Sequence, residues 1–188
     1  ISRISINPQT MNQKTLDIIG RRHTVEQTVD AFHLARELGF DNINMDLIVG
    51  LPGEEYGQVE HTMKEVTALD PDSITVHSLA VKRAARLNMF KDQYKEMTFT
   101  NNQQIMEMTA RYAYQAGHSP YYLYRQKNMA GNFENVGYAK PDSAGIYNIL
   151  IMEEKQSILA LGAGATSKKV TGELIQRTEN VKDIKNYV

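Results

Sequence analysis

One acidic residue, Asp46, lies inside a largely apolar run, residues 43–49. A run of this composition predicts a strand buried on both faces, as in parallel sheets. An ionised carboxylate there is costly unless a partner compensates its charge. Two interpretations stay open: a structural carboxylate bonded to backbone, Arg3 or Arg21, or a ligand-binding group. The second is favoured by the position, because ligands of parallel α/β folds gather at the carboxyl ends of strands, where we expect Asp46 to lie.

Two more polar side chains are predicted near that end. Gln9 follows the apolar run 2–6, and its amide either contacts a polar ligand or caps its own loop. Arg21 follows the break at Gly20, just before a predicted helix. Its planar guanidinium suits recognition of a carboxylate, whereas the alternative is a solvated Arg21-Arg22 pair.

Other chemical signals are weaker. The glycine-rich segment 161–166 lies late in the chain and does not open a helix, unlike a dinucleotide-binding loop, so its glycines indicate close backbone approach. His77, near the end of a predicted strand, either faces the same cleft as Asp46 or is a satisfied core histidine. The chain contains no cysteine, so it cannot itself form a disulfide or a cysteine-ligated zinc or iron–sulfur site.

The elements that must position these residues alternate between β-rich runs and helical periods. The order predicts an α/β fold with a parallel sheet and helical crossovers. Thr24 and Gln27 form a capping-box signature at one helix start. Strands are expected at 2–6, 43–49, 73–79 and 121–125, and helices between 24 and 39, 59 and 69, and 101 and 116.

The character of the chain changes near residue 126. Residues 128–142 are rich in Asn, Gly and Lys, which predicts a long loop. Antiparallel strands are expected at 145–152, 157–161 and 174–178, followed by the start of a helix at 180–188. We therefore predict two domains, 1–125 and 126–188, and leave residues 82–95 unassigned.

Composition excludes some functions. The 21 basic and 22 acidic residues are interspersed and give a net charge of -1, which does not favour nucleic-acid binding. No apolar run is long enough to cross a bilayer, and we expect a cytoplasmic protein without a membrane partner. The first residue is Ile1, in a predicted strand, so we expect the sequence to begin inside a longer protein.

Several segments, in their order and spacing, resemble oxygen-independent coproporphyrinogen III oxidases. Three later segments resemble the subgroup of coproporphyrinogen dehydrogenases of the Gram-positive type, so that the resemblance covers nearly the whole chain. The early segments are 3–6 with Gln9, 20–24 and 39–54, and the later ones are 121–128, 135–138 and 161–165.

The resemblance implies the C-terminal half of a partial (β/α) radical S-adenosylmethionine barrel, followed by a small β-rich region. In this family a [4Fe-4S] cluster binds S-adenosylmethionine and cleaves it to a 5′-deoxyadenosyl radical. That radical starts the decarboxylation of coproporphyrinogen III propionates to vinyl groups in haem biosynthesis. Gln9, Arg21 and Asp46 match cofactor-contacting positions, with Asp46 suited to the ribose hydroxyls. Ala80 matches a backbone contact, and Thr166 falls at a pocket position that is often apolar in the family.

The family's Cys-x-x-x-Cys-x-x-Cys motif would lie upstream of the residues present here. We therefore expect this chain alone to be inactive, and to self-associate through an exposed edge strand containing Ile4 and Ile6. The resemblance implies a porphyrinogen substrate and an electron donor for the cluster as partners. Candidate partners for the substrate propionates are Arg125, Lys127, Lys168 and Lys169.

Two other functions remain open. Some family relatives are thought to transfer haem rather than oxidise porphyrinogens, and they share much of this pattern. An unrelated α/β barrel hydrolase or aldolase would need a carboxylate pair or a Schiff-base lysine at strand ends, whereas the sequence shows only Asp46 there.

Overall fold

The computed structural model describes residues 3–80, 97–124 and 133–187. The unassigned segment 82–95 and the candidate residues Arg125 and Lys127 lie outside these ranges. The backbone packs into two compact units, Ile1–Ala144 and Gly145–Val188. Each unit is described separately below, and the first unit extends beyond the predicted boundary at residue 125.

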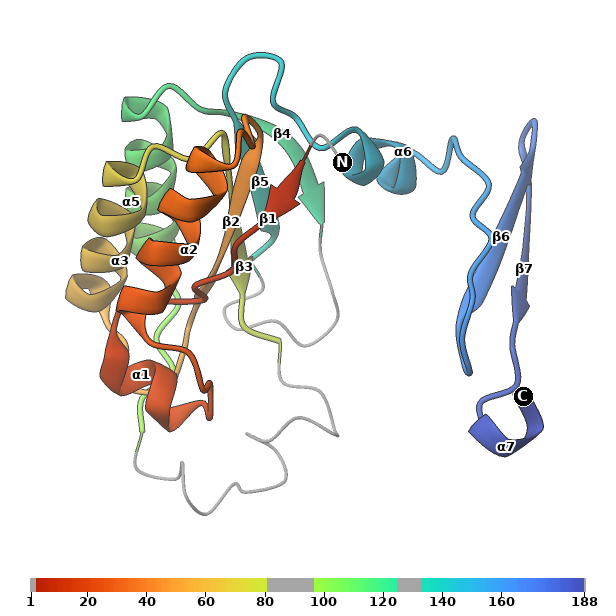
Figure 1. Cartoon of the computed structure of the whole chain (residues 1–188), viewed down its shortest axis with the longest axis horizontal. Helices are drawn as coiled ribbons and strands as arrows, with labels where there is room; N and C mark the ends of the chain where they lie inside the picture. Colours follow the sequence, from red (N-terminus) through yellow and green to blue (C-terminus); the bar gives the residue numbers. More distant parts are fainter. Residues whose placement is uncertain (1–2, 81–96, 125–132, 188) are drawn as a thin grey trace. The chain divides into compact units, whose positions relative to one another are not determined.

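The first unit contains a five-stranded sheet with the order β1-β2-β3-β5-β4 (Figure 1). Its strands β1, β2 and β3 are parallel neighbours, and β5 is antiparallel to both β3 and β4. Consequently β4 runs in the same direction as β1, β2 and β3, and the antiparallel β5 lies between β3 and β4. The strands are Ile4–Ser5 (β1), Ile43–Val49 (β2), Ser73–Ser78 (β3), Ser119–Tyr124 (β4) and Asn135–Ala139 (β5).

Two predictions about this sheet need correction. The sheet is mixed rather than wholly parallel, and residues 135–139 form a strand although we predicted a loop from 128 to 142. The strand alternates Val136 and Tyr138 toward the core with small residues on the other face, a pattern concealed by its Asn- and Gly-rich surroundings. The predicted edge is confirmed, because β1 lies at one end of the strand order.

Helices cover one face of the sheet in Figure 1. The capping box at α2 is confirmed: Gln27 N donates to Thr24 Oγ1 at 3.1 Å, and Thr24 N donates to Gln27 Oε1 at 2.9 Å. Gly39, with φ 85°, follows the end of this helix. The helices are Gln13–Ile18 (α1), which we had not predicted, Val25–Glu37 (α2), Tyr56–Ala68 (α3) and Gln103–Gln115 (α5).

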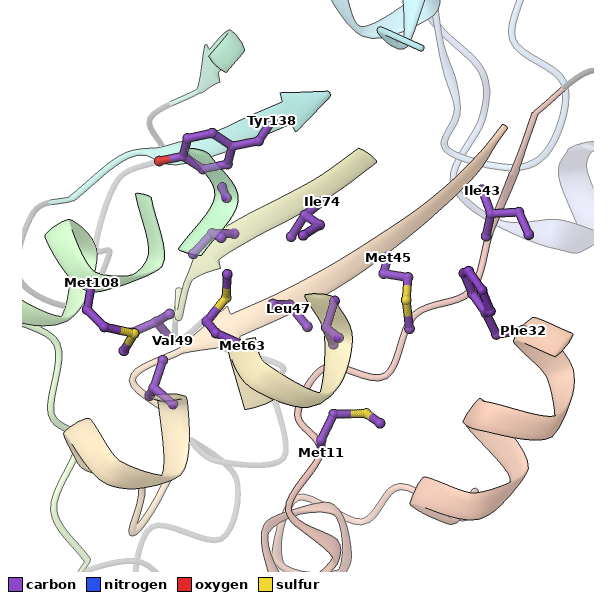
Figure 2. Close-up of a cluster of buried hydrophobic side chains, with 14 of the residues drawn as sticks. Met11, Phe32, Ile43, Met45, Leu47, Val49, Met63, Ile74, Met108 and Tyr138 are labelled. Carbon is purple, nitrogen blue, oxygen red and sulfur yellow. The ribbon is translucent and has the colours of Figure 1, made fainter. Parts of the chain in front are cut away.

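The core lies between these helices and the sheet, and the odd-numbered residues of β2 belong to it. Figure 2 shows Met45 and Leu47 pointing toward the helical layer, where Phe32 and Met63 are also buried. Each fully buried side chain of this size contributes about 1.5–3 kcal/mol through the hydrophobic effect. Because side chains alternate along a strand, the even-numbered residues of β2 lie on the opposite face.

The second unit consists of a helix, a hairpin and a short terminal helix. Residues 145–152 were predicted as a strand, but Ile146–Met152 forms α6, and a short apolar run does not distinguish the two by periodicity. Residues 157–161 contribute only an isolated bridge, Ile158 to Lys168, instead of the predicted strand. The predicted strand 174–178 is confirmed. The remaining elements are Thr166–Thr171 (β6), Leu174–Glu179 (β7) and Ile184–Tyr187 (α7).

None of the helices in the described ranges is both long and apolar enough to cross a membrane.

Candidate functional site

The face of the sheet opposite the helices carries polar side chains from β2 and β3. Asn44 of β2 is in register with Ser73 of β3, and Asp46 is in register with Thr75. Ile48 is likewise in register with His77, so the histidine lies diagonally beside Asp46, one pleat further toward the carboxyl ends of the strands. We use the name polar face for six residues of these strands and of β4. They are Asn44, Asp46, Ser73, Thr75, His77 and Tyr122.

Asn44 is the centre of the hydrogen bonding on the polar face. Its Nδ2 donates to Asp46 Oδ1 at 2.6 Å and to Ser5 Oγ at 3.2 Å. Its Oδ1 accepts from Ser73 Oγ at 3.1 Å and from Thr75 Oγ1 at 3.2 Å. These four bonds use the full capacity of one amide, so Asn44 holds the Asp46 carboxylate in a defined orientation. We did not predict a role for Asn44 from the sequence, although polar residues at every second position of the two strands are a signal for it.

Asp46 is charged in this setting. Burial acts to raise the pKa of its carboxyl, but the neighbouring His77 and the hydrogen bond from Asn44 outweigh burial and lower the pKa. Asp46 Oδ2 lies 3.8 Å from His77 Nε2, within ion-pair range but beyond a direct hydrogen bond. Arg3, considered from the sequence as a possible partner of Asp46, instead donates from Nη1 to Ser73 Oγ at 3.0 Å.

The position of Asp46 differs from the prediction. It lies in the middle of Ile43–Val49 rather than at the carboxyl end of the strand. Its side chain is 25% exposed and that of His77 is 32% exposed, so both reach the surface of the polar face. Of the two interpretations of His77 left open by the sequence, the distance to Asp46 supports the one in which both residues face the same side of the sheet.

Gln9 is joined to the Asp46 strand through its backbone. Its N donates to Asp46 O at 3.1 Å, and its O accepts from Ile48 N at 2.8 Å, which continues the parallel pairing beyond β1. Gln9 has φ 66°, a left-handed conformation uncommon outside glycine, and strain of this kind concentrates at functional sites. Its Nε2 donates to Asn7 O at 3.3 Å. The structure thus brings Gln9 and Asp46 together.

Three other residues were predicted to contact the cofactor, and the structure does not join them to Asp46 as it joins Gln9. They are Arg21, Ala80 and Thr166. Arg21 is exposed just beyond α1, and the segment that follows it returns to the Gln9 loop, because His23 Nε2 is 3.3 Å from Pro8 O. Ala80 follows β3, one residue after Leu79, whose N donates to Val49 O at 2.9 Å. Thr166 is the first residue of β6 in the second unit and is exposed.

A second buried carboxyl, Glu54, supports the Gln9 loop. Glu54 is 1% exposed, and its Oε1 accepts from Thr10 Oγ1 at 2.6 Å and from Asn12 Nδ2 at 3.0 Å. Burial raises the pKa of Glu54 despite these bonds. Met11 N also donates to Thr62 Oγ1 of α3 at 3.0 Å. These hydrogen bonds hold residues 10–12 against the turn after β2. The sequence contains no signal for a buried Glu54, because a glutamate that follows a glycine is typical of an exposed turn.

Tyr122 extends the polar face across β5. Its ring lies against Gly137, where an added Cβ would come within 2.0 Å of Tyr122 Cε1. Burial raises the pKa of the Tyr122 hydroxyl, although the neighbouring Thr75 acts in the opposite direction. Only glycine at position 137 lets this tyrosine reach the centre of the sheet.

The arrangement suits a hydroxyl-bearing ligand better than a metal. A charged carboxylate and an imidazole lie side by side and partly exposed, and both form hydrogen bonds with alcohols. Within the described ranges, no group of three or more His, Cys, Asp or Glu residues could hold a metal ion. Since the chain has no cysteine, its own residues do not fit an iron–sulfur cluster.

The chain is similar in sequence to known protein families. The Radical SAM superfamily model matches residues 1–66. The chain is 49% identical over 190 residues to the oxygen-independent coproporphyrinogen-III oxidase-like protein HemZ of Bacillus subtilis, covering 100% of this chain and 38% of that protein. It is 38% identical over 82 residues to the heme chaperone HemW of Bacillus subtilis, covering 44% of this chain and 22% of that protein.

The fold is also that of a solved radical enzyme. The structure of coproporphyrinogen III oxidase (HemN) from Escherichia coli superposes with a TM-score of 0.71 at 21% identity, covering 98% of this chain and 42% of that one. The chain thus spans well under half the length of the relatives that it matches. The chain is thus similar over its whole length to part of an oxygen-independent coproporphyrinogen-III oxidase-like protein, and its residues 1–66 match the Radical SAM superfamily.

Proposed function

We propose that this chain forms part of the S-adenosylmethionine site of a radical enzyme that converts coproporphyrinogen III propionates to vinyl groups in haem biosynthesis. The observation that carries the proposal is the charged, partly exposed Asp46, held by Asn44 beside the backbone of Gln9. The 49% identity to a coproporphyrinogen-III oxidase-like protein supports the substrate class.

Most of the predicted residues have a physical role in this proposal. The Asp46 carboxylate accepts hydrogen bonds from ribose hydroxyls, and its lowered pKa keeps it an acceptor at neutral pH. The exposed guanidinium of Arg21 suits the carboxylate of the methionine moiety. Gln9 and Ala80 line the ends of the parallel strands, and Thr166 is assigned from the family resemblance alone.

The remaining parts of the reaction come from groups that this chain does not supply. When bound to its cluster, the cofactor supplies the radical that abstracts hydrogen from the substrate. An electron donor reduces the cluster, and the porphyrinogen is the substrate. Of the lysines predicted to contact propionates, Lys169 is exposed, whereas the Lys168 side chain is 9% exposed and lies 3.8 Å from Glu154. Lys169 is therefore the better candidate.

Calorimetric titration with S-adenosylmethionine tests the cofactor site. We expect the full-length protein with a rebuilt cluster to bind more tightly than this chain alone, and Asp46→Asn to weaken binding about tenfold or more, because it removes a charged acceptor. Asp41→Asn is the matched control, since it removes the same charge from an exposed position before β2. Unchanged affinity in Asp46→Asn would contradict the assignment.

The match to a heme chaperone supports a second candidate function, haem binding and transfer. The same full-length protein should be titrated with haem and, separately, assayed for vinyl formation from coproporphyrinogen III. Vinyl formation without stoichiometric haem binding supports the oxidase. Haem binding without vinyl formation supports the transfer function.

A further inference from the structure

The two carboxylate oxygens of Asp46 are not equivalent. Oδ1 receives a short hydrogen bond, 2.6 Å, from Asn44, an amide with no remaining capacity for a ligand. Oδ2 faces His77 Nε2 across 3.8 Å, which is too long for a direct hydrogen bond. An oxygen atom about 2.8 Å from each of them would fit this separation. The same spacing accommodates two neighbouring hydroxyls, one bound to each residue.

The solvent exposure of the side chains also points to Asp46 and His77 as the residues that a ligand can reach. Their neighbours Asn44 and Thr75 are 3% and 2% exposed, and each is occupied by hydrogen bonds inside the polar face. Asp46 and His77 are more exposed than both of these neighbours. His77 also lies nearer the carboxyl ends of the strands, on the side toward Ala80.

We propose that His77 is a second binding residue for the ribose diol of the adenosyl cofactor, acting beside Asp46. This inference rests on the proposed function, and it adds a residue that the family resemblance did not assign. Asp46 Oδ2 accepts a hydrogen bond from one ribose hydroxyl, and His77 Nε2 forms a hydrogen bond with the adjacent hydroxyl. The pair therefore selects for an intact vicinal diol over a deoxyribose, because a missing hydroxyl leaves one of the two groups without its ligand.

Calorimetry on the full-length protein with its cluster rebuilt tests this assignment with S-adenosylmethionine and its 2′-deoxy and 3′-deoxy analogues. We expect His77→Phe, which keeps a planar ring but loses the nitrogen, to weaken S-adenosylmethionine binding about three- to tenfold. For the analogue that lacks the hydroxyl bound by His77, the same substitution should change affinity less than twofold. His77→Gln, whose amide reaches a similar position, should restore part of the lost affinity.

The outcomes separate this inference from the proposed function. Equal losses for all three ligands in His77→Phe, or no loss for any, overturn the role of His77. If Asp46→Asn weakens binding while His77→Phe does not, only the inference about His77 is wrong. If the unsubstituted protein does not bind S-adenosylmethionine, both are wrong. Circular dichroism and the unfolding temperature of each variant show whether the fold is intact, and the partial rescue by His77→Gln distinguishes ligand contact from a structural role.

Discussion

The two faces of the five-stranded sheet are built on different physical principles. On β2, Met45 and Leu47 point toward the helices and are buried among apolar side chains, as Figure 2 shows. Their neighbours Asn44 and Asp46 lie on the other face, among hydroxyls, an amide and an imidazole. A single strand thus contributes alternately to the core and to the candidate site.

This difference shows where stability and specificity reside. Burial of apolar surface is non-directional, so the helical face stabilises the fold as long as volume is conserved. A buried polar group costs free energy unless it has a partner, so the polar face depends on the geometry of each hydrogen bond. The helical face should therefore dominate unfolding measurements, and the polar face should dominate ligand binding.

The largest expected effect tests the helical face. Met45→Ala removes a fully buried side chain and leaves a cavity, and we expect it to lower the free energy of unfolding by about 2–5 kcal/mol. Urea denaturation followed by circular dichroism measures this change. Asp46→Asn, one residue away on the other face, is the comparison and should cost less. An equal cost for both would show that the two faces contribute alike to stability.

A smaller effect is expected where the polar face crosses β5. Gly137→Ala forces the Tyr122 ring away from its packed position on Gly137, which should cost about 1–3 kcal/mol of unfolding free energy. In the Tyr122→Ala background the added methyl has room, so Gly137→Ala should cost much less there. A double-mutant cycle by urea denaturation measures the difference. Additive losses would argue against the packing of Tyr122 on Gly137.

The smallest effect concerns pH, and it contrasts the two buried carboxyls. The pKa of Asp46 is lowered from its ordinary 3.8, so its stabilising contribution is present above that value and is lost as pH falls through the folded-state pKa. The pKa of Glu54 is raised from its ordinary 4.5, so its contribution is greatest below that value and is lost as pH rises through the folded-state pKa.

Isosteric neutral variants test these opposite signs. From urea denaturation between about pH 3 and pH 7, Asp46→Asn should reduce the loss of stability at the acid end. Glu54→Gln should gain stability relative to the unsubstituted chain as pH rises above 4.5, because its side chain stays neutral. If both variants change the pH profile in the same direction, the contrast between the two carboxyls is wrong.

Local signals account for the elements that the sequence predicted well. The Thr24–Gln27 capping box and the periodicity after it are confined to one helix, and the apolar run 43–49 coincides with β2. Long-range pairing explains the errors. The strand Asn135–Ala139 is stabilised by β3 and β4, and its own composition does not indicate a strand. The run at 146–152 is apolar enough for either a strand or a helix.

By itself, the sequence determined the α/β alternation, the resemblance to the coproporphyrinogen III oxidase family and the choice of Asp46 as a candidate ligand-binding residue. Only the tertiary structure decided what surrounds Asp46. The proximity of Thr75 and His77 to Asp46 depends on the register of β2 against β3, whose paired residues are 29 positions apart in the sequence, as in the Ser73–Asn44 hydrogen bond. Periodicity and capping are local properties of a chain, whereas register and burial arise only when distant segments pack together.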